Sequence, residues 1–461
     1  MQISTPLAEQ EELFGERQYY FKFVHPALYD IKGAENPLIH HYERREPQES
    51  NVEYRIALKE KSYILKVDAI NINLYSTGVG IMSFYLKNDR EEQNEETHIR
   101  DINQFGRRIM PPHSGEFSPE YRSLIAHSIS ITGLDGNEEN YCDTFDYAKE
   151  RGGMAQRGFS NIWQPAHFIS NLIKELSPTL IVTPVIDDRM IVNCWYCNKE
   201  MSEQIKDIKL EEPDKANFDK SDFWYKYIFV DSGNKHDDVT CQNKEMRKKL
   251  IEDSTYYRWQ EQGILYGITR YSVIALTDES RFAKNILAMH MRTIYARMIE
   301  LVIIQRASIL RFSEEVTKVS ALKENNPKDI SEYASSLYKE YIRFVNQIFF
   351  RNITAQDQGI ELYEMMMKQF NSEVQIKELD EEISELHQYI TLKIEQRRSE
   401  NGDFLNLLAA IFLPATLLTG IFGMNPIFRE ESLNIYDWTT QLSIIAIATI
   451  ISIILLRHKR K

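Results

Sequence analysis

Two uncharged hydrophobic runs near the C-terminus constrain this chain more than any other feature. They cover residues 404–422 and 438–456, and each is 19 residues long. That length matches the roughly 20 apolar residues that a helix needs to cross the hydrocarbon core of a bilayer. One such run could be a buried core helix, but two in succession with a short polar segment between them favour two transmembrane helices.

The charges that flank the two runs predict their orientation. Arg397 and Arg398 precede the first run, and four of the five residues at 457–461 are basic. The intervening residues 423–437 hold three acidic side chains and one basic side chain. Because positively charged loops stay in the cytoplasm, we expect a multi-pass protein of the cell's inner (cytoplasmic) membrane with both termini in the cytoplasm.

The composition limits the classes of protein that remain. The chain has 461 residues, a net charge of −13 and a mean hydropathy of −0.42. That average excludes a protein with many spans, and the acidic balance argues against direct binding of nucleic acid. The four cysteines are too few for a disulfide framework and are typical of a reducing compartment.

The residues before about 275 indicate a mixed α/β domain. Alternating or continuous runs of β-branched and aromatic residues are typical of strands. Two of these runs, 179–186 and 190–197, are expected to pair as a hairpin across Asp187-Asp188-Arg189. The other expected elements are strands at 54–60, 63–75, 80–86 and 264–276 and a helix at 168–176.

A helical stalk is predicted from 276 to 403. Residues 279–319 form one expected helix, a second begins near Asp329, and a third continues from about Gln356 to the end of the first hydrophobic run. Apolar residues step by three and four along the third helix, which is the spacing of a coiled-coil seam. These residues are Ile376, Leu379, Ile383, Leu386 and Ile390. The acidic residues beside them could sense cations between subunits or simply form a solvated face.

Gly423-Met424-Asn425 directly follows the first hydrophobic run. Mg²⁺ holds its waters tightly and prefers oxygen partners. A symmetric ring of Asn425 carbonyls could therefore bind the hydrated ion from its outer shell. Gly423 lets the helix end and the backbone approach the axis, and Pro426 biases Asn425 toward an extended conformation. The alternative is an ordinary helix C-terminus.

With this motif in place, residues 355–461 resemble the CorA family of magnesium channels. The resemblance rests on the stalk, Pro414 within the first run, the Gly-Met-Asn motif, the acidic loop, the second run and the basic tail. It implies a CorA-like fold: an α/β N-terminal cytoplasmic domain, a long helical stalk and two C-terminal transmembrane helices. One pair of spans cannot enclose a pore, so we expect a homo-oligomer, which the family implies is a pentamer. Pro426 departs from the aromatic residue that family members often carry there.

The same resemblance assigns one helical stripe of the first run to the pore. Two leucines on it would be apolar constrictions that gate by dewetting. The alternative is that the stripe faces lipid or the second span, which its polar members disfavour. The pore residues are Leu405, Asn406, Ala409, Leu413, Thr416 and Gly420, and Gly423, Met424 and Asn425 are the expected Mg²⁺ site.

A second candidate site centres on Arg107 and Arg108, which lie in a loop bounded by glycine and proline. Paired arginines in a fixed loop can fork onto a phosphate, while Asp187 or Asp188, beside Arg189, could take ribose hydroxyls. The alternative is a structural salt bridge between the same arginines and aspartates.

Cys194 and Cys197 suggest a zinc site, with His236 and Cys241 as further ligands. In a strand, however, residues three apart point to opposite faces. Buried structural cysteines are therefore the preferred interpretation.

Several segments of the N-terminal domain and one of the stalk resemble the divergent CorA-like proteins of type III CRISPR systems. The segments are FGRRIMPP (105–112), STGVG (76–80), DDRM (187–190) with Cys-Trp-Tyr (194–196), and QRASIL (305–310). This resemblance implies an antiviral membrane effector gated by a nucleotide second messenger, adenylated S-adenosylmethionine (SAM-AMP). The alternatives are a housekeeping Mg²⁺ channel, a transporter of Zn²⁺ or another divalent ion, and a non-conducting receptor. No enzyme constellation is found.

The sequence thus predicts six successive parts. They are the ligand-sensing cytoplasmic α/β domain (1–275), the helical stalk (276–403), the pore-lining transmembrane helix (404–422), the Gly-Met-Asn motif with the extracytoplasmic loop (423–437), the second transmembrane helix (438–456) and a basic cytoplasmic tail (457–461).

Overall fold

The computed structural model describes most of the chain up to Met424 and divides it into two units. The first unit comprises Met1–Thr317 and Lys339–Asp380, and the second comprises Lys318–Tyr338 and Glu381–Lys461. The described residues are 15–45, 51–109, 126–134, 141–144, 165–187, 189–206, 222–231, 239–321 and 327–424, with the single positions 439, 443, 446, 447 and 450.

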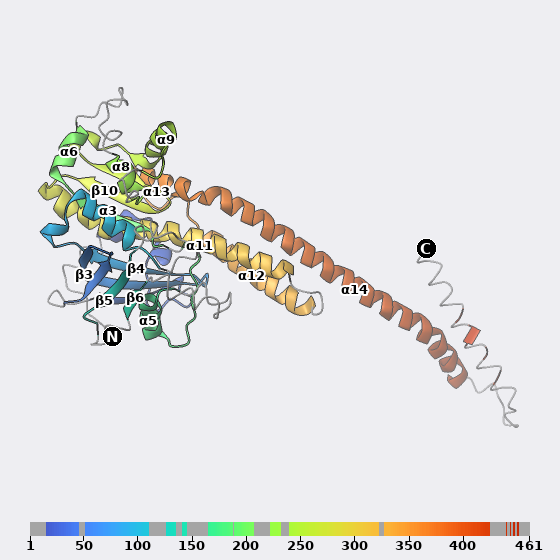
Figure 1. Ribbon diagram of the computed structural model, residues 1–461. Coiled ribbons are helices and arrows are strands. Elements are labelled where there is room, and N and C mark those ends of the chain that lie inside the picture. The colour runs from blue at the N-terminus through green and yellow to red at the C-terminus, as the bar shows by residue number, and fades with distance from the viewer. Residues whose placement is uncertain are drawn as a thin grey trace. The chain divides into compact units, whose positions relative to one another are not determined.

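An antiparallel sheet of six strands forms one half of the first unit (Figure 1). Its longest strand, β3, pairs with β1 and β2 along one edge and with β4 along the other. Every second side chain of β3 is buried, as expected for a strand with one face in the core, and these side chains include the polar Asn71 and Asn73. The strands are β1 (Ile39–Arg45), β2 (Glu53–Ala57), β3 (Ser62–Tyr75), β4 (Gly80–Lys87), β5 (Ser128–Thr132) and β6 (Cys142–Thr144).

A second sheet has the order β7-β10-β9-β8. It corrects two predictions. Residues 179–186 form no strand, and β7 pairs in parallel with β10 instead of forming a hairpin with them. The expected strand at 264–276 is two antiparallel strands that turn between Ile268 and Ser272. The strands are β7 (Val192–Cys197), β8 (Thr255–Tyr256), β9 (Leu265–Ile268) and β10 (Ser272–Thr277).

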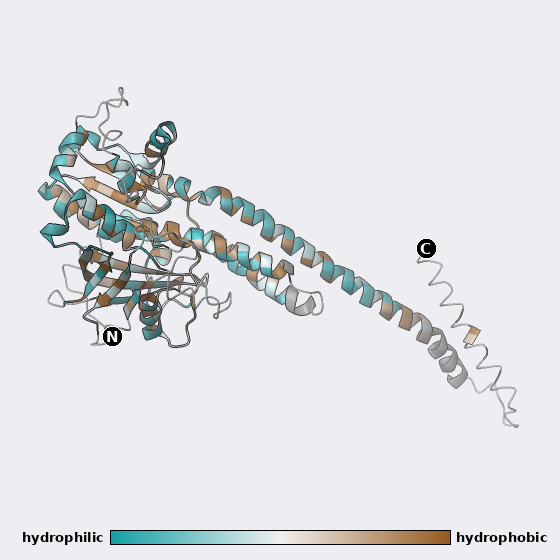
Figure 2. Ribbon diagram, viewed as in Figure 1, coloured by the Kyte–Doolittle hydropathy of each residue, from teal (hydrophilic) through white to brown (hydrophobic). Residues whose placement is uncertain are grey.

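Short helices cover the two sheets, whose strands are largely hydrophobic (Figure 2). Helix α3 (Glu96–Phe105) lies between the sheets, because Ile102 and Phe105 pack into the core of the first sheet while Ile99 packs into that of the second. The others are α2 (His25–Leu28), α5 (His167–Leu176), α6 (Lys199–Lys206), α8 (Phe223–Ile228) and α9 (Lys244–Ser254), with 3-10 turns η1 (Glu91–Gln93) and η6 (Gln260–Gln262).

The predicted stalk is helical, with breaks that the sequence did not reveal. The helix expected from 356 to 422 is interrupted at Asn371, which has a left-handed φ of 54°. Asparagine tolerates this conformation and therefore ends helices. The stalk elements are the π-helix η7 (Ala283–Leu287), α10 (Ala288–Arg292), α11 (Ile294–Ala321), α12 (Pro327–Gln347), α13 (Asp357–Phe370) and α14 (Ser372–Met424).

Four residues of the apolar seam of α14 are buried, as its spacing predicts, and the fifth, Leu386, is half-buried. Ile376 and Leu379 are buried in the first unit, and Ile383 and Ile390 in the second. In the second unit, α12 packs beside this helix, because the rings of Tyr338 and His387 stack with centroids 4.5 Å apart.

Among the helices that the structure describes, none combines the length and the apolar character that crossing a membrane requires. The first hydrophobic run lies within α14, which extends two residues beyond the predicted end at 422. Apart from the single positions named above, the second run lies outside the described residues, as do the acidic loop and the basic tail. The two transmembrane helices therefore stay a prediction.

Candidate functional site

The two segments that carry the predicted ligand residues meet directly. Helix α3 ends at Phe105, and a Cβ on the next residue, Gly106, would lie 2.7 Å from the carbonyl oxygen of Ile102. Only glycine fits there, and the chain then continues as an extended segment. Arg108 forms an antiparallel β-bridge with Arg189, and the Met190 N–H donates to the Arg107 carbonyl at 2.6 Å. The backbone thus brings three arginines together.

The Arg107 side chain is only 4% exposed, yet its hydrogen bonding is incomplete. Its Nη2 donates to Gln104 Oε1 at 3.0 Å and to the Val230 carbonyl at 3.4 Å. Its Nε and Nη1 have no hydrogen-bond partner among the described residues. Burial lowers the pKa of Arg107 to about 10, and the charge of Arg189 adds to this effect. A buried guanidinium with two unused donors is suited to bind an anion.

Tyr271 completes the cluster, and the sequence alone did not single it out. The guanidinium carbons of Arg107 and Arg189 lie 5.7 and 5.4 Å from the centre of its ring. Both distances allow a cation–π contact. The tyrosine is 37% exposed, so an aromatic face borders the arginines at the surface. We call Arg107, Arg108, Arg189 and Tyr271 the arginine site.

The structure describes one ion pair between the predicted arginines and aspartates. Asp187 Oδ2 accepts from Arg189 Nη2 at 3.1 Å. No ion pair of Arg107 is found in the part of the chain that the structure describes. Asp188 lies outside the described residues. Among the described residues, the site thus brings three arginines and one aspartate beside an aromatic ring, and guanidinium groups of this kind can contact an anion.

The other pair of motifs, STGVG and QRASIL, also meet but form a structural contact. Ser308 Oγ donates to Thr77 Oγ1 at 3.0 Å, and Arg311 Nη1 donates to the Thr77 carbonyl at 2.6 Å. Gly78 has a φ of 73°, which permits the tight turn. This contact fixes the β3–β4 turn to α11.

The cysteines behave as structural residues. The Tyr227 hydroxyl contacts Cys194 Sγ at 3.4 Å, and Cys197 Sγ donates to the Asp278 carbonyl at 3.1 Å. Burial raises the pKa of Cys194, which disfavours the thiolate that zinc requires. In the described ranges no three histidine, cysteine or acidic side chains could hold a metal ion, while His236 lies outside them. Sensing of cations by stalk carboxylates between subunits stays a prediction.

The expected pore stripe lies on α14. Leu405 and Leu413 are each 64% exposed, and Thr416 Oγ1 donates back to the Phe412 carbonyl at 2.7 Å. Asn406, Ala409 and Gly420 are exposed on the same helix. Gly423 and Met424 are the last residues of α14 that the structure describes, so the expected end of the helix at Gly423 stays a prediction. Asn425, the central residue of the expected ion site, lies outside the described residues.

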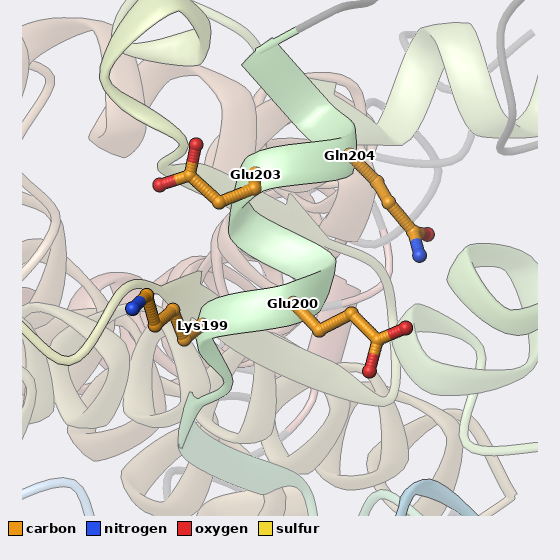
Figure 3. A pocket seen from close by; sticks show the side chains of 4 residues that line it. All are labelled: Lys199, Glu200, Glu203 and Gln204. Carbon is orange, nitrogen blue, oxygen red and sulfur yellow. The ribbon is translucent and has the colours of Figure 1, made fainter.

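A surface pocket of about 540 Å³ lies along α6 (Figure 3). It is lined by Lys199, Glu200, Glu203 and Gln204. None of the predicted site residues contributes to it.

The comparisons with known proteins concern the C-terminal part of the chain. Residues 267–460 match the family described as CorA-like Mg2+ transporter protein. This part of the chain is CorA-like. The family is described as one of Mg2+ transporters, which agrees with the prediction that the protein is not an enzyme. Comparison with curated proteins and with solved structures gave no significant match.

Proposed function

We propose that the protein is the subunit of a homo-oligomeric Mg²⁺ channel of the cell membrane. The observation that carries this proposal is the match to CorA-like Mg²⁺ transporters over residues 267–460, which contain the Gly-Met-Asn motif between two hydrophobic runs. The first run would line the pore, and Asn425 carbonyls would bind the hydrated ion at its outer end.

The exposed surface of α14 supports an assembly in lipid. Phe404, Leu405, Phe412 and Leu413 are each more than half exposed in the single chain. Apolar side chains in such number need covering by other subunits or by lipid. One pair of spans cannot enclose a pore, so several copies, five by analogy with the CorA family, would surround it.

Reconstitution tests this function. Purified protein in vesicles that contain a fluorescent Mg²⁺ indicator should admit Mg²⁺ when the ion is added outside, while vesicles without protein should not. The same vesicles challenged with Zn²⁺ and a zinc indicator distinguish the Zn²⁺ alternative. A properly assembled oligomer that conducts neither ion would favour the non-conducting receptor.

We further propose that a nucleotide second messenger, SAM-AMP, binds the arginine site and gates the channel in antiviral defence. The support is Arg107, whose buried guanidinium lies beside Arg189 and Tyr271 and has two donors without a hydrogen-bond partner among the described residues. The alternative is a housekeeping Mg²⁺ channel without nucleotide gating, in which the same site binds no such ligand.

Calorimetric titration separates these two alternatives. The wild type should bind SAM-AMP, and the Arg107→Ala/Arg108→Ala double variant should bind it at least a hundredfold more weakly, since each charge-assisted contact is worth about 1.5–3 kcal/mol. Arg55→Ala, which removes an arginine from β2, is the matched control and should bind normally. If the wild type binds no nucleotide, the housekeeping Mg²⁺ channel is the alternative that remains.

A further inference from the structure

The turn between β9 and β10 contacts two regions of the first unit with neighbouring side chains. Tyr271 packs its ring against Arg107 and Arg189. Its neighbour Arg270 donates from Nε to the Gln369 carbonyl, at 3.1 Å, in the last turn of α13. We propose that this turn transmits the state of the arginine site to the junction between α13 and α14, the helix whose C-terminal part would line the pore. The regulatory meaning of this link rests on the proposed ligand site.

The turn is held as a rigid piece. The Thr269 N–H donates to the Ser272 carbonyl at 2.9 Å, and both residues are fully buried. Both hydroxyls donate to the Ile228 carbonyl at the end of α8, with Thr269 Oγ1 at 3.1 Å. A displacement of Tyr271 should therefore move the whole turn, including Arg270.

Arg107 reaches the turn by a second route through the backbone. Its Nη2 contacts the Val230 carbonyl, two residues after Ile228. Val230 has a φ of 51°, a left-handed conformation that β-branched residues rarely adopt. Such strain persists only where surrounding contacts hold it. An anion that draws Arg107 toward itself would weaken both of its contacts with this region, the ring of Tyr271 and the carbonyl of Val230.

The proposed link ends at the junction where α13 stops and α14 begins. Arg306 Nη1 donates to the Phe370 carbonyl at 2.8 Å and to Gln375 Oε1, in the first turns of α14, at 3.2 Å. With Arg270 on Gln369, two arginines thus hold the last carbonyls of α13, where positive charge is favourable. Asn371 separates the two helices in its left-handed conformation. Loss of the Arg270 contact would loosen one side of this junction.

Amide hydrogen exchange on the full-length protein tests the link without any ligand. In the proposal, Arg107→Ala perturbs Tyr271 and raises exchange at amides 372–376 by about fivefold, the lower end of typical coupling between sites. Arg270→Gln alone should have a similar effect. In a protein that already carries Arg270→Gln, the additional Arg107→Ala substitution should then change the exchange at these amides by less than twofold. Arg258→Gln is the control, since Arg258 also contacts α13, at Glu361, but lies outside the turn.

The outcomes separate this inference from the proposed ligand. If Arg107→Ala raises exchange equally with and without Arg270, the turn does not transmit and the inference is wrong. If the wild type does not bind SAM-AMP, the proposed nucleotide gating is wrong. The exchange measurements on the Arg107 and Arg270 variants still test whether the turn connects the arginine site with the α13–α14 junction. If SAM-AMP binds, Arg270→Gln should leave its affinity within twofold and reduce ligand-dependent Mg²⁺ flux at least fivefold. Unchanged ligand-dependent flux in this variant would contradict the link.

Discussion

Arg107 is the residue at which binding and stability are most clearly opposed. Its guanidinium is buried near two other arginines, and two of its donors find no partner among the described residues. A buried charge without full compensation is costly, and proteins retain such groups chiefly at functional sites. The buried charge of Arg107 therefore destabilises the folded protein when no ligand is bound, and a bound anion would offset this destabilisation.

Replacement of Arg107 by methionine should stabilise the free protein. Because the pKa of Arg107 is lowered to about 10, the charged form is less favourable in the folded state than in the unfolded chain. Arg107→Met should raise Tm at pH 7 by about 1–3 °C and abolish nucleotide binding. The free-energy cost of the charged Arg107 in the folded wild type falls as the pH rises above its folded pKa. The difference in Tm between the variant and the wild type should therefore begin to shrink near pH 10. Thermal unfolding at pH 7 and pH 10 measures both effects, and a lower Tm at pH 7 would assign Arg107 a structural role.

The sequence located only part of this site. The candidate residues Arg107, Arg108 and Arg189 lie together in the structure, and the sequence marked their two segments by neighbouring glycine, proline and aspartate residues. Tyr271 was not found, since its approach to the arginines depends on the parallel pairing of β7 with β10. The missed signal was Thr269-Arg270-Tyr271, three residues with polar groups that interrupt an otherwise apolar run.

At the scale of elements, predictions held where the contacts are local. The antiparallel strands 54–60, 63–75 and 80–86 correspond to β2, β3 and β4, because alternation along one strand reports the face that is buried. The hairpin prediction for 179–186 failed, and Ile181 in this segment is 90% exposed. Apolar content alone cannot show which distant strand provides the hydrogen bonds of β7.

Asn371 should behave as a position that requires a left-handed residue. Asn371→Ala should lower the free energy of unfolding by about 1 kcal/mol, because a Cβ without a local hydrogen-bonding group disfavours positive φ. Asn371→Gly should change it by only a few tenths of a kcal/mol, since glycine adopts this conformation freely. Denaturant unfolding of both variants makes the comparison. Equal stability of the alanine variant and the wild type would mean that α13 and α14 join in one continuous helix.

At the scale of the whole molecule, a large polar N-terminal part is joined to a short hydrophobic C-terminal part. The net charge of −13 and the mean hydropathy of −0.42 are averages over the whole chain, so they do not reveal the hydrophobic C-terminal part. Local hydropathy and the Gly-Met-Asn motif indicated the CorA-like region, and the match over residues 267–460 supports it. The preceding residues lie outside that match, so their role depends on the geometry of the arginine site.

The predicted topology can be tested by labelling intact cells. A cysteine introduced by Ser432→Cys should react with a membrane-impermeant thiol reagent, because the loop between the runs would face outward. The four native cysteines, all before residue 275, should not react until the cells are permeabilised. A tag after Lys461 should be protected in the same way. Labelling of the native cysteines in intact cells would reverse the orientation.

The central claim is that the Gly-Met-Asn motif forms the ion-selecting end of a Mg²⁺ pore, and Mg²⁺ entry into reconstituted vesicles tests it most directly. Asn425→Ala removes the proposed ring of carbonyl oxygens and should reduce Mg²⁺ entry at least tenfold while the oligomer keeps its size. Asn434→Ala, in the same loop, is the matched control and should conduct as the wild type does. Mg²⁺ entry at the wild-type rate in correctly assembled Asn425→Ala protein would contradict the assignment of the pore.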